Sequence, residues 1–440
     1  MFHLSHSIEP GAGAAVIAAR IEAAIAGGGL APGARLPTIR ELAADLEISP
    51  ATVAAAYRVL RQRGLISANS RRGTVVAAQP PLRVSGARPL PAGMRDLTGG
   101  NPDPLLLPPL APVLAALDPR HKLYGGPVAL ARLTELAEAD FGADGIGGSI
   151  AVAGGALDGI ERTLQTQLRP GDRVAVEDPG WPRIGDLVRS LGLRPEPMLL
   201  DQHGPLPGEL ARALDQGAKA VIATPRGQNP TGAALSAARG RELRALLGRH
   251  PDVVVIEDDY IAAVAGVPYV SLHDGSARWV VIRSLSKVLG PDLRVAPMAG
   301  DALTISRVEG RQLLGAGWVS HLLQQTAANL WAGERTAELL AAAGRAYADR
   351  RTALIAALAR HRVTAYGHTG LGVWIPLAEE AETVRQLFDR GWAVTPGERF
   401  RFRAPPGIRV TTTDLSPDDA GRLAADISQV ISATTATYSG

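Results

Sequence analysis

The sequence predicts two folded parts, a small basic module of helices and a hairpin, and a much larger α/β body. Short apolar runs alternate with helical stretches from residue 97 onward, which is typical of a mostly parallel sheet covered on both faces. The first 90 residues carry ten arginines and five acidic residues, a net charge of +5, against +3 for the whole chain. Between the two parts, residues 79–95 hold four prolines and little apolar periodicity, which indicates a semi-rigid linker.

Composition narrows the class of protein. A chain of 440 residues allows about two to four domains, each with its own core. Because cysteine is absent, there is no disulfide, no thiolate nucleophile and no cysteine-ligated metal. The first ten residues lack a signal-peptide pattern, and no apolar run approaches the roughly 20 residues that span a bilayer. We therefore expect a cytoplasmic protein with no membrane partner, whose basic N-terminal part binds an anionic partner, nucleic acid first.

The basic part is expected to begin with a helix over residues 14–28, where apolar residues recur at helical spacing until three glycines end the pattern. Thr38 can cap a second helix, which places Leu42 and its apolar neighbours inward. Ser49 can cap a third helix with Pro50 at its first position, where the missing N–H costs nothing.

The third helix has two unlike faces. The apolar face contains Val53, Ala56, Tyr57 and Leu60. The outer face is small and polar and contains Ala51, Thr52, Ala55 and Arg58. Residues 65–76 then indicate a hairpin with basic residues at its tip. Two short helices of this kind suit a DNA major groove, and a basic hairpin tip reaches phosphate or the minor groove. The alternative is a helical packing module with a solvated basic face.

Three motifs resemble the winged helix-turn-helix of GntR-type bacterial regulators: LPTIRELA (36–43), ISPATVAAAY (48–57) and RRGTV (71–75). The chain departs from that family at Pro50, where an arginine is common, so Arg58 or Arg61 would bind more of the phosphate backbone. The resemblance implies a DNA-binding domain over residues 10–78 whose contacts include Thr38, Arg40, Ser49, Thr52, Arg58, Arg71, Arg72 and Gly73.

The larger body is expected to span residues 96–440. Strands are predicted at 150–152, 174–176, 220–223, 253–256 and 279–282, and helices at 156–168, 235–247 and 305–314. Residues 345–430 indicate a long helix, a few strands and a closing helix. The prediction is a large subdomain of about 125–330 and a small α+β subdomain of 331–440 together with 96–124.

Ligands of such sheets bind at the carboxyl ends of the strands, so the residues that follow each apolar run are informative. A glycine turn at Gly155 and Ala156 follows the first run and opens a helix, where backbone N–H groups can bind phosphate. Trp181 follows the second run on a Pro-Gly turn and could stack on an aromatic ligand. Asn229 follows the third run.

The fourth and fifth runs end in charged groups. Residues 257–260, EDDY, follow the fourth run; they could bind Mg²⁺, but no G-x-x-x-x-G-K loop accompanies them, and a carboxylate could instead hold the proton of a pyridinium ring. The fifth run leads to Ser284, Ser286 and Lys287, with Arg294 seven residues further on. Taken alone, Lys287 would be a surface lysine after a strand.

Together, the strand ends fit one cofactor, pyridoxal 5′-phosphate (PLP), and we expect no metal. Lys287 would form an imine with PLP, and Asp258 would keep the ring nitrogen protonated. Asn229 and Tyr260 would hydrogen-bond the ring oxygen. Lys287, Asp258 and Tyr260 would be the catalytic residues of any reaction at the site. The groups that would bind the phosphate are Gly155, Ala156, Ser284, Ser286 and Arg294.

The motifs NPTG (229–232), DDY (258–260) and SLSK (284–287) resemble fold-type I aminotransferases, over roughly residues 97–435. Joined to the GntR-type motifs, they are similar to the MocR-type transcriptional regulators, which EDPGWPR (177–183) also fits, with Trp181 where that group usually has tyrosine. The resemblance implies that Arg409 binds a substrate carboxylate, that Arg183 contacts an effector, and that Tyr124 reaches the phosphate of a partner subunit in a homodimer. For Arg409 the alternative is a surface arginine on a strand.

We therefore expect a PLP-dependent, ligand-responsive regulator that binds double-stranded operator DNA as a homodimer. It would sense an amine, an amino acid or a vitamin B6 compound through the Lys287 imine. The alternative is an active aminotransferase with an accessory N-terminal domain. A regulator that has lost PLP is a second alternative, which the joint presence of Lys287, Asp258 and Arg294 disfavours.

Overall fold

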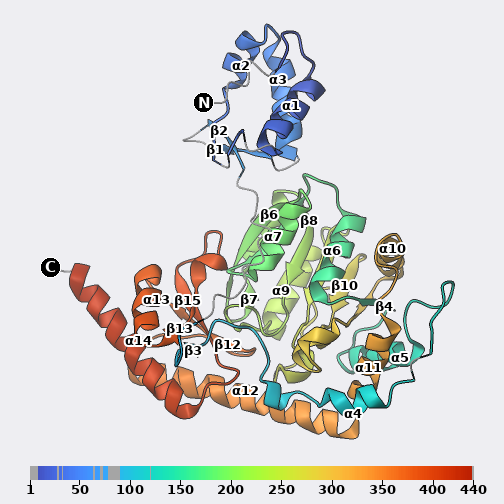
Figure 1. The fold of residues 1–440 in the computed structure, drawn as a ribbon, viewed down its shortest axis with the longest axis vertical. Coiled ribbons are helices and arrows are strands. Elements are labelled where there is room, and N and C mark those ends of the chain that lie inside the picture. Colours follow the sequence, from blue (N-terminus) through green and yellow to red (C-terminus); the bar gives the residue numbers. More distant parts are fainter. Residues whose placement is uncertain are drawn as a thin grey trace. The chain divides into compact units, whose positions relative to one another are not determined.

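The computed structural model of the chain describes residues 8–26, 29–31, 33–62, 65–69, 73–77, 90–118 and 120–438. These residues form two compact units, a small N-terminal one and a large body (Figure 1). Most of the predicted linker, 79–95, lies outside the described residues, as do Arg71 and Arg72. No helix of the described segments combines the length and the apolar character that crossing a membrane requires.

The N-terminal unit contains three helices and a two-stranded antiparallel hairpin: α1 (Ala14–Ala26), α2 (Ile39–Asp45), α3 (Pro50–Gln62), β1 (Ile66–Asn69) and β2 (Gly73–Val76). The predicted inward face of α3 is fully buried. Tyr57 of that face donates its hydroxyl hydrogen to the Pro37 carbonyl oxygen at 2.8 Å, which fixes α3 to the turn before α2. On α1, Ile17 and Ile21 are fully buried, whereas Val16 is 52% exposed.

Both predicted caps of this unit form. Thr38 and Glu41 make a reciprocal capping box, with Glu41 N donating to Thr38 Oγ1 at 3.2 Å and Thr38 N donating to Glu41 Oε2 at 2.7 Å. At the start of α3, Thr52 N donates to Ser49 Oγ at 3.2 Å. The two polar side chains therefore satisfy backbone donors that a helix start would otherwise expose.

The large body is an α/β structure, as predicted, but its eight-stranded sheet is mixed. Strand β11 runs antiparallel to both of its neighbours, and β7 runs antiparallel to β6, whereas β8, β9 and β10 are parallel. In spatial order the strands are β4 (Ser149–Ala153), β11 (Ala296–Gly300), β10 (Trp279–Ile282), β9 (Val254–Asp258), β8 (Ala218–Ala223), β5 (Arg173–Asp178), β6 (Arg194–Asp201) and β7 (Gly204–Pro205).

Helices cover both faces of this sheet. Side chains alternate along the strands, so apolar groups lie on both faces and both must be covered. Ile282 faces α6, close to Gly159, whereas Val281 packs with Ala137 and Phe141 of α5 on the opposite face. The helices of this part are α4 (Leu110–Ala115), α5 (Ala131–Ala143), α6 (Ala156–Gln167), α7 (Pro182–Ser190), α8 (Pro207–Asp215), α9 (Ala237–Leu247), α10 (Ala302–Leu313) and α11 (His321–Trp331). Short 3₁₀ turns occur at Pro104–Leu106, Ala262–Val264, Leu285–Lys287 and Pro291–Leu293.

A second, smaller core lies around the chain's last strands. Strands β12, β15 and β14 form one sheet and β13 pairs with β3, next to α13 and α14. The bounds are α12 (Glu334–Arg360), α13 (Glu380–Asp389), α14 (Pro417–Tyr438), β3 (Arg95–Asp96), β12 (Gly372–Pro376), β13 (Trp392–Ala393), β14 (Thr395–Pro396) and β15 (Gly407–Thr411), with a 3₁₀ turn at Gly397–Arg399.

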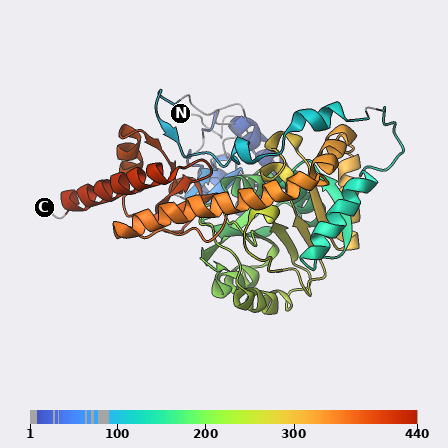
Figure 2. The ribbon, with the colours of Figure 1, turned by 90° about the horizontal axis from the view of Figure 1, so that it is seen from below.

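Helix α12 belongs to both cores of the body. Its first half contributes Leu340 and Tyr347 to the core beside the large sheet, and its second half contributes Leu354 and Leu358 to the core beside the small sheet. Figure 2 shows α12 running beneath the body, with α14 alongside its second half. This single helix therefore connects the two sheets mechanically.

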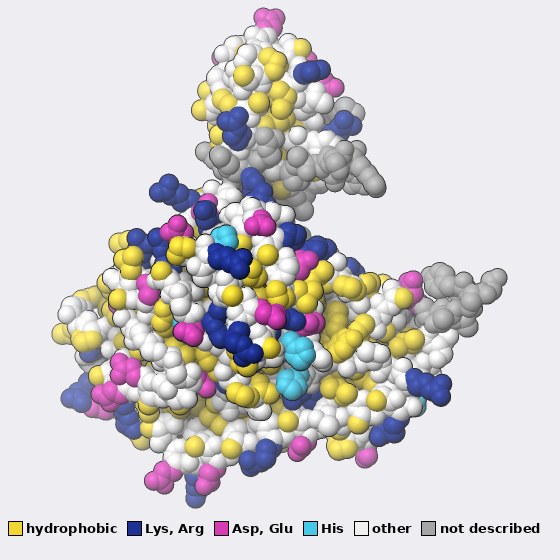
Figure 3. All heavy atoms as spheres, turned by 180° about the vertical axis from the view of Figure 1, so that it is seen from behind, with side chains coloured by type: hydrophobic (Ala, Val, Ile, Leu, Met, Phe, Trp, Pro, Cys, Tyr) yellow, Lys and Arg dark blue, Asp and Glu magenta, His cyan; other side chains and the backbone are white. Residues whose placement is uncertain are grey.

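Charge on the body is balanced. Figure 3 shows basic and acidic side chains interspersed over the face of the body that it displays. Residues 91–440 sum to a net charge of −2, so the chain's positive excess lies in the first 90 residues.

The Tyr57 hydroxyl should contribute to the stability of the N-terminal unit. Tyr57→Phe leaves the Pro37 carbonyl without its donor, and we expect a loss of about 1 kcal/mol in the opening free energy of α3. Hydrogen exchange of α3 amides in the full-length protein measures this loss. As a control, Tyr366→Phe removes the hydroxyl of a 43% exposed ring in the other unit and should leave α3 exchange unchanged. Equal protection in both variants would contradict the assignment.

Candidate functional site

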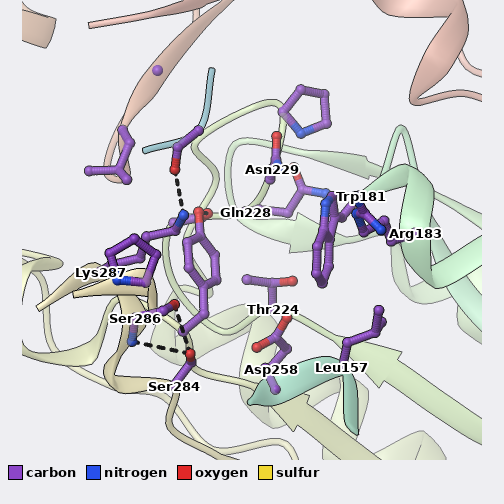
Figure 4. Close-up of a pocket in the computed structure, with 18 of the residues that line it drawn as sticks. Leu157, Trp181, Arg183, Thr224, Gln228, Asn229, Asp258, Ser284, Ser286 and Lys287 are labelled. Atoms are coloured by element: carbon purple, nitrogen blue, oxygen red, sulfur yellow. Dashed lines mark hydrogen bonds between the residues drawn. The ribbon is translucent and has the colours of Figure 1, made fainter. Parts of the chain in front are cut away.

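A cavity of about 510 Å³ lies where the predicted strand ends meet in the large body (Figure 4). Eleven of the predicted site residues line it: Ala156, Trp181, Arg183, Asn229, Asp258, Tyr260, Ser284, Ser286, Lys287, Arg294 and Arg409. The chain segments that supply them lie as far as 253 residues apart, so tertiary structure assembles the site.

Lys287 projects into this cavity from a 3₁₀ turn directly after β10. Ser284 caps the turn by accepting a hydrogen bond from Ser286 N at 3.3 Å, and Lys287 Nζ donates to the Gly100 carbonyl oxygen at 2.5 Å. Burial and the nearby Arg409 guanidinium lower the pKa of Lys287 to about 8, against the opposing effect of Asp258. A neutral, nucleophilic amine is therefore far more accessible here than on an ordinary lysine.

Asp258 is the last residue of β9 and is 5% exposed. Its Oδ1 atom is buried and has no hydrogen-bond partner among the described residues. Burial raises the pKa of Asp258 to about 7, and the negative charges of Asp259 and Glu177 add to the effect. A buried carboxyl oxygen without a donor is costly, so this atom is prepared for a donor that the chain itself does not provide.

An anion cradle forms where β4 turns into α6. Gly155 adopts φ +113°, and a Cβ at this position would lie 2.1 Å from an Arg294 nitrogen, so only glycine leaves room for the guanidinium. Arg294 itself is in the left-handed conformation and donates to the Gly154 carbonyl at 2.9 Å. The hydroxyls of Ser284 and Ser286, 2.8 Å apart, line the same cavity. Arginine, two hydroxyls and a helix start suit a phosphate.

Arg409 reaches the cavity from β15 of the small sheet. It donates to Asn229 Oδ1 at 3.1 Å and to backbone carbonyls of Thr98 and Gly99, and its Nε is buried without a partner. Within the described residues it has no acidic partner. Burial lowers its pKa to about 10. A half-buried guanidinium that lacks a carboxylate suits an anionic ligand, and the side chain is not an exposed surface arginine.

Tyr260 and Asn229, expected to bond the same ring oxygen, are both held by the protein. The Tyr260 hydroxyl donates to the Gly227 carbonyl oxygen at 2.6 Å, and burial raises its pKa. The Asn229 side-chain oxygen accepts a hydrogen bond from Arg409, and this contact fixes the orientation of the Asn229 amide. Figure 4 shows Trp181 and Arg183 together at the side of the cavity opposite Lys287, and Arg183 is exposed.

Several cavity residues were absent from the sequence prediction, among them Thr224, Gln228 and Gly100. Thr224 and Gln228 bind the buried Glu177, through Thr224 N at 2.9 Å, Thr224 Oγ1 at 3.0 Å and Gln228 Nε2 at 3.1 Å. Burial raises the pKa of Glu177 to about 7 despite these donors. All three residues flank motifs that the sequence does show, but a hydrogen bond across 51 positions leaves no local signal.

Tyr124 does not line the cavity of its own chain. Its ring is 91% exposed and packs edge-on against Trp318, with 5.4 Å between ring centroids. Its predicted contact with a partner subunit therefore stays a prediction.

Most of the predicted DNA contacts that the structure describes are exposed. Arg40, Arg58 and the two cap residues Thr38 and Ser49 are exposed, and Thr52 is half-buried against Ser49, with 2.8 Å between their hydroxyls. Gly73 opens β2 with φ +74°, a backbone conformation that favours glycine. The side-chain oxygens of Thr38 and Ser49 already accept hydrogen bonds from backbone N–H groups, so part of their hydrogen-bonding capacity is used within the protein.

The residues of the cavity fit PLP. The unpaired Asp258 Oδ1 suits a pyridinium N–H, the Gly155 and Arg294 cradle suits a phosphate, and the Lys287 amine suits an aldehyde. Asp258, Glu257 and Asp259, the run first considered for Mg²⁺, point apart. Glu257 Oε1 lies 2.7 Å from His273 Nδ1, and Asp259 binds two arginines.

Comparison with known proteins agrees with this chemistry. Residues 129–427 match the family of class I and II aminotransferases, and residues 14–76 match the bacterial regulatory proteins of the gntR family. The vitamin B6 salvage pathway transcriptional repressor PtsJ of Salmonella typhimurium is 40% identical over 90% of this chain and 93% of its own length. The pyridoxine biosynthesis regulator PdxR of Corynebacterium glutamicum is 29% identical over 62% of this chain and 63% of its own length.

Solved structures share the fold of the body. The kynurenine aminotransferase of Pyrococcus horikoshii superposes with a TM-score of 0.71 and 22% identity, over 78% of this chain and 92% of that one. The aminotransferase LysN of Thermus thermophilus gives a TM-score of 0.70 at 20% identity, over 79% and 94%. Together with the family matches, these likenesses establish an aminotransferase-type body whose cofactor is PLP.

Asp258 should cost the apoprotein stability in a pH-dependent way. Its pKa is about 7 when folded and about 3.9 when unfolded, so between these values the folded state binds more protons and loses stability as pH rises. Asp258→Asn removes this loss. Urea unfolding without PLP measures the free energy of unfolding of both proteins. Between pH 5 and pH 7.5, the free energy of unfolding of the variant should rise relative to that of the wild type by on the order of 1 kcal/mol or more. A difference that stays constant with pH would show that Asp258 titrates normally.

Proposed function

Because the chain belongs to the MocR-type transcriptional regulators, which join a GntR-type winged helix-turn-helix to an aminotransferase-like domain, we propose that it is a PLP-dependent, ligand-responsive repressor or activator. Its operator affinity would respond to an amine, an amino acid or a vitamin B6 compound. The observation that carries the proposal is the pairing of Lys287 with the donor-less Asp258 in one cavity of a chain that also has a DNA-binding unit.

When bound, PLP would supply an aldehyde that is reactive toward the Lys287 amine and a ring that accepts electrons. The chain's own residues would hold it in place. Asp258 would accept the ring N–H, and Arg294 with the two serine hydroxyls would bind the phosphate. The lowered pKa of Lys287 keeps a substantial fraction of its amine neutral near neutral pH.

Arg409 and Arg183 support an anionic effector. Arg409 is a half-buried cation without an acidic partner among the described residues, so it would bind a carboxylate or similar group. Arg183 lines the mouth of the cavity and is exposed. The name of PtsJ refers to vitamin B6 salvage, so a B6 compound is one effector to test, and PLP itself could be both cofactor and signal.

The body offers a route by which a ligand could alter its shape. Asp178, at the end of β5, accepts hydrogen bonds from Phe402 N at 2.9 Å, Arg403 N at 2.8 Å and Ala404 N at 3.1 Å. These residues belong to the loop between β14 and β15 of the small sheet. A ligand that contacts Trp181 on one side and Arg409 on the other would favour one arrangement of the two sheets, and DNA affinity would change if the two arrangements bind DNA differently.

A homodimer is part of the proposal. The segment before α5 exposes apolar side chains, with Leu105 89%, Leu123 77% and Tyr124 91% exposed. A surface of this kind favours burial against another chain. Two DNA-binding units would then meet two operator half-sites, and a protein that binds such DNA would act in the cytoplasm.

An active aminotransferase is the second candidate. It is favoured by the intact Asn229 and Arg409 contact and by relatives such as the aminotransferase tdiD of Emericella nidulans, which is 28% identical over 58% of this chain. Turnover of an amino donor and a keto acid at about 1 s⁻¹ or faster, without any DNA shift, would establish this function instead.

Operator binding measured with and without PLP tests the regulator directly. We expect PLP to change the affinity of the wild type by at least fivefold, since allosteric coupling of this size is typical. Lys287→Ala removes the amine and should abolish the response. Lys219→Ala, which removes an exposed lysine of β8, serves as the matched control. Identical DNA affinity in all conditions would remove the coupling.

Arg409 should determine effector binding without determining PLP binding. Arg409→Gln removes the charge but keeps an amide, so the effector concentration for half-maximal response should rise about tenfold or more, as expected for losing a charged hydrogen bond. PLP affinity, measured by absorbance titration, should change far less. Equal losses in both measurements would mean that Arg409 supports the fold of the cavity and does not bind the effector.

A further inference from the structure

Three buried charged residues adjoin the cavity but do not line it. Arg226, Asp259 and Arg283 follow the neighbouring parallel strands β8, β9 and β10. Each stands next to residues that do line the cavity, namely Gly227, Asp258, Tyr260 and Ser284. Because side chains alternate along an extended chain, the three charged residues point to the opposite face of the sheet.

On that face they form one ionic cluster centred on Asp259, which is fully buried. Arg226 binds both carboxylate oxygens of Asp259, from Nε at 2.8 Å and from a terminal nitrogen at 2.9 Å. Arg283 Nε donates to Asp259 Oδ2 at 2.9 Å. One carboxylate thus holds two guanidinium groups from the two flanking strands.

Helix α5 completes the cluster. Arg283 donates to the Asp140 carboxylate at 2.7 Å and to the Asp140 carbonyl at 2.8 Å, and its guanidinium lies 4.7 Å from the Phe141 ring centre. Asp144, the residue after α5, accepts from Arg226 at 2.9 Å and also from Arg283. The strand ends are therefore bound to each other and to the helix that covers them.

A cluster of this kind is expected to fix geometry more than to add stability. Buried ion pairs cost desolvation and are often no more stabilising than apolar packing of the same volume, but a satisfied network permits only one arrangement. Here that arrangement fixes the relative positions of Asp258, Ser284 and the Gly227 turn, on which the Tyr260 hydroxyl depends. A small shift between these strand ends would misplace the groups that face the cofactor.

We propose that Arg226, Asp259 and Arg283 form a positioning clamp that sets the spacing of three strand ends and thereby the affinity of the cavity for PLP. None of the three touches the cavity, so they act through their neighbours and are not catalytic residues. The inference depends on the cofactor and not on the proposed response of DNA binding.

Two clamp variants and one control test it. Asp259→Asn keeps the shape and removes the central charge, and Arg226→Lys keeps the charge but loses the two-pronged contact. The control is Arg239→Gln, which breaks another two-pronged arginine–carboxylate pair, to Asp201 at 2.9 and 3.1 Å, on a residue that does not line the cavity. For each full-length protein, the PLP dissociation constant and the apoprotein's melting temperature are measured.

A positioning role predicts at least a tenfold weaker PLP affinity for Asp259→Asn and a loss of at least threefold for Arg226→Lys, with the control within twofold of the wild type. PLP would then raise the melting temperature of the clamp variants less than that of the wild type, because ligand stabilisation follows affinity. PLP affinities within twofold of the wild type in both clamp variants would overturn the proposal. Failure of both to fold would overturn it as well, in favour of a purely structural role.

Discussion

Side-chain alternation at the ends of β8, β9 and β10 is the constraint on which the rest of the body depends. At each end, one residue faces the cavity and the next faces the opposite side of the sheet. Asp258 faces the cavity with an unpaired oxygen, whereas the adjacent Asp259 faces the other side of the sheet and binds Arg226 and Arg283. The cavity can hold incompletely satisfied polar groups because the ionic cluster on the other face keeps the strand ends fixed.

The cavity maintains an electrostatic imbalance that a cofactor would relieve. Burial raises the pKa of Asp258 and lowers the pKa of Lys287 and Arg409, so each group is shifted toward its neutral form. A chain selected for stability alone would replace such groups with apolar ones. Their presence on three separate elements, with one carboxyl oxygen lacking a donor, is the physical signature of a ligand site.

Three of the contacts that join the two cores of the body lie on different elements. Helix α12 packs in both, Asp178 accepts three backbone hydrogen bonds from the loop before β15, and Arg409 of β15 binds Asn229 of the large part. The third of these contacts lies in the cavity, which both Arg409 and Asn229 line. A ligand bound there would therefore touch one of the connections between the two sheets, which is what a sensor requires.

Apolar periodicity, capping residues and local motifs are properties of adjacent positions, so they predict the two-part organisation, five strands of the large sheet, both caps of the DNA-binding unit and strand-end residues that line the cavity. The sequence did not show β6, whose two prolines obscure a strand, or β11, whose small residues carry no strong pattern. Only the tertiary structure placed Glu177 beneath Thr224 and Gln228, paired Arg409 with Asn229, and gathered Asp140, Asp144, Arg226, Asp259 and Arg283 into one cluster. Those contacts join residues tens to hundreds of positions apart, and their partners follow from strand order and burial, which no local pattern encodes.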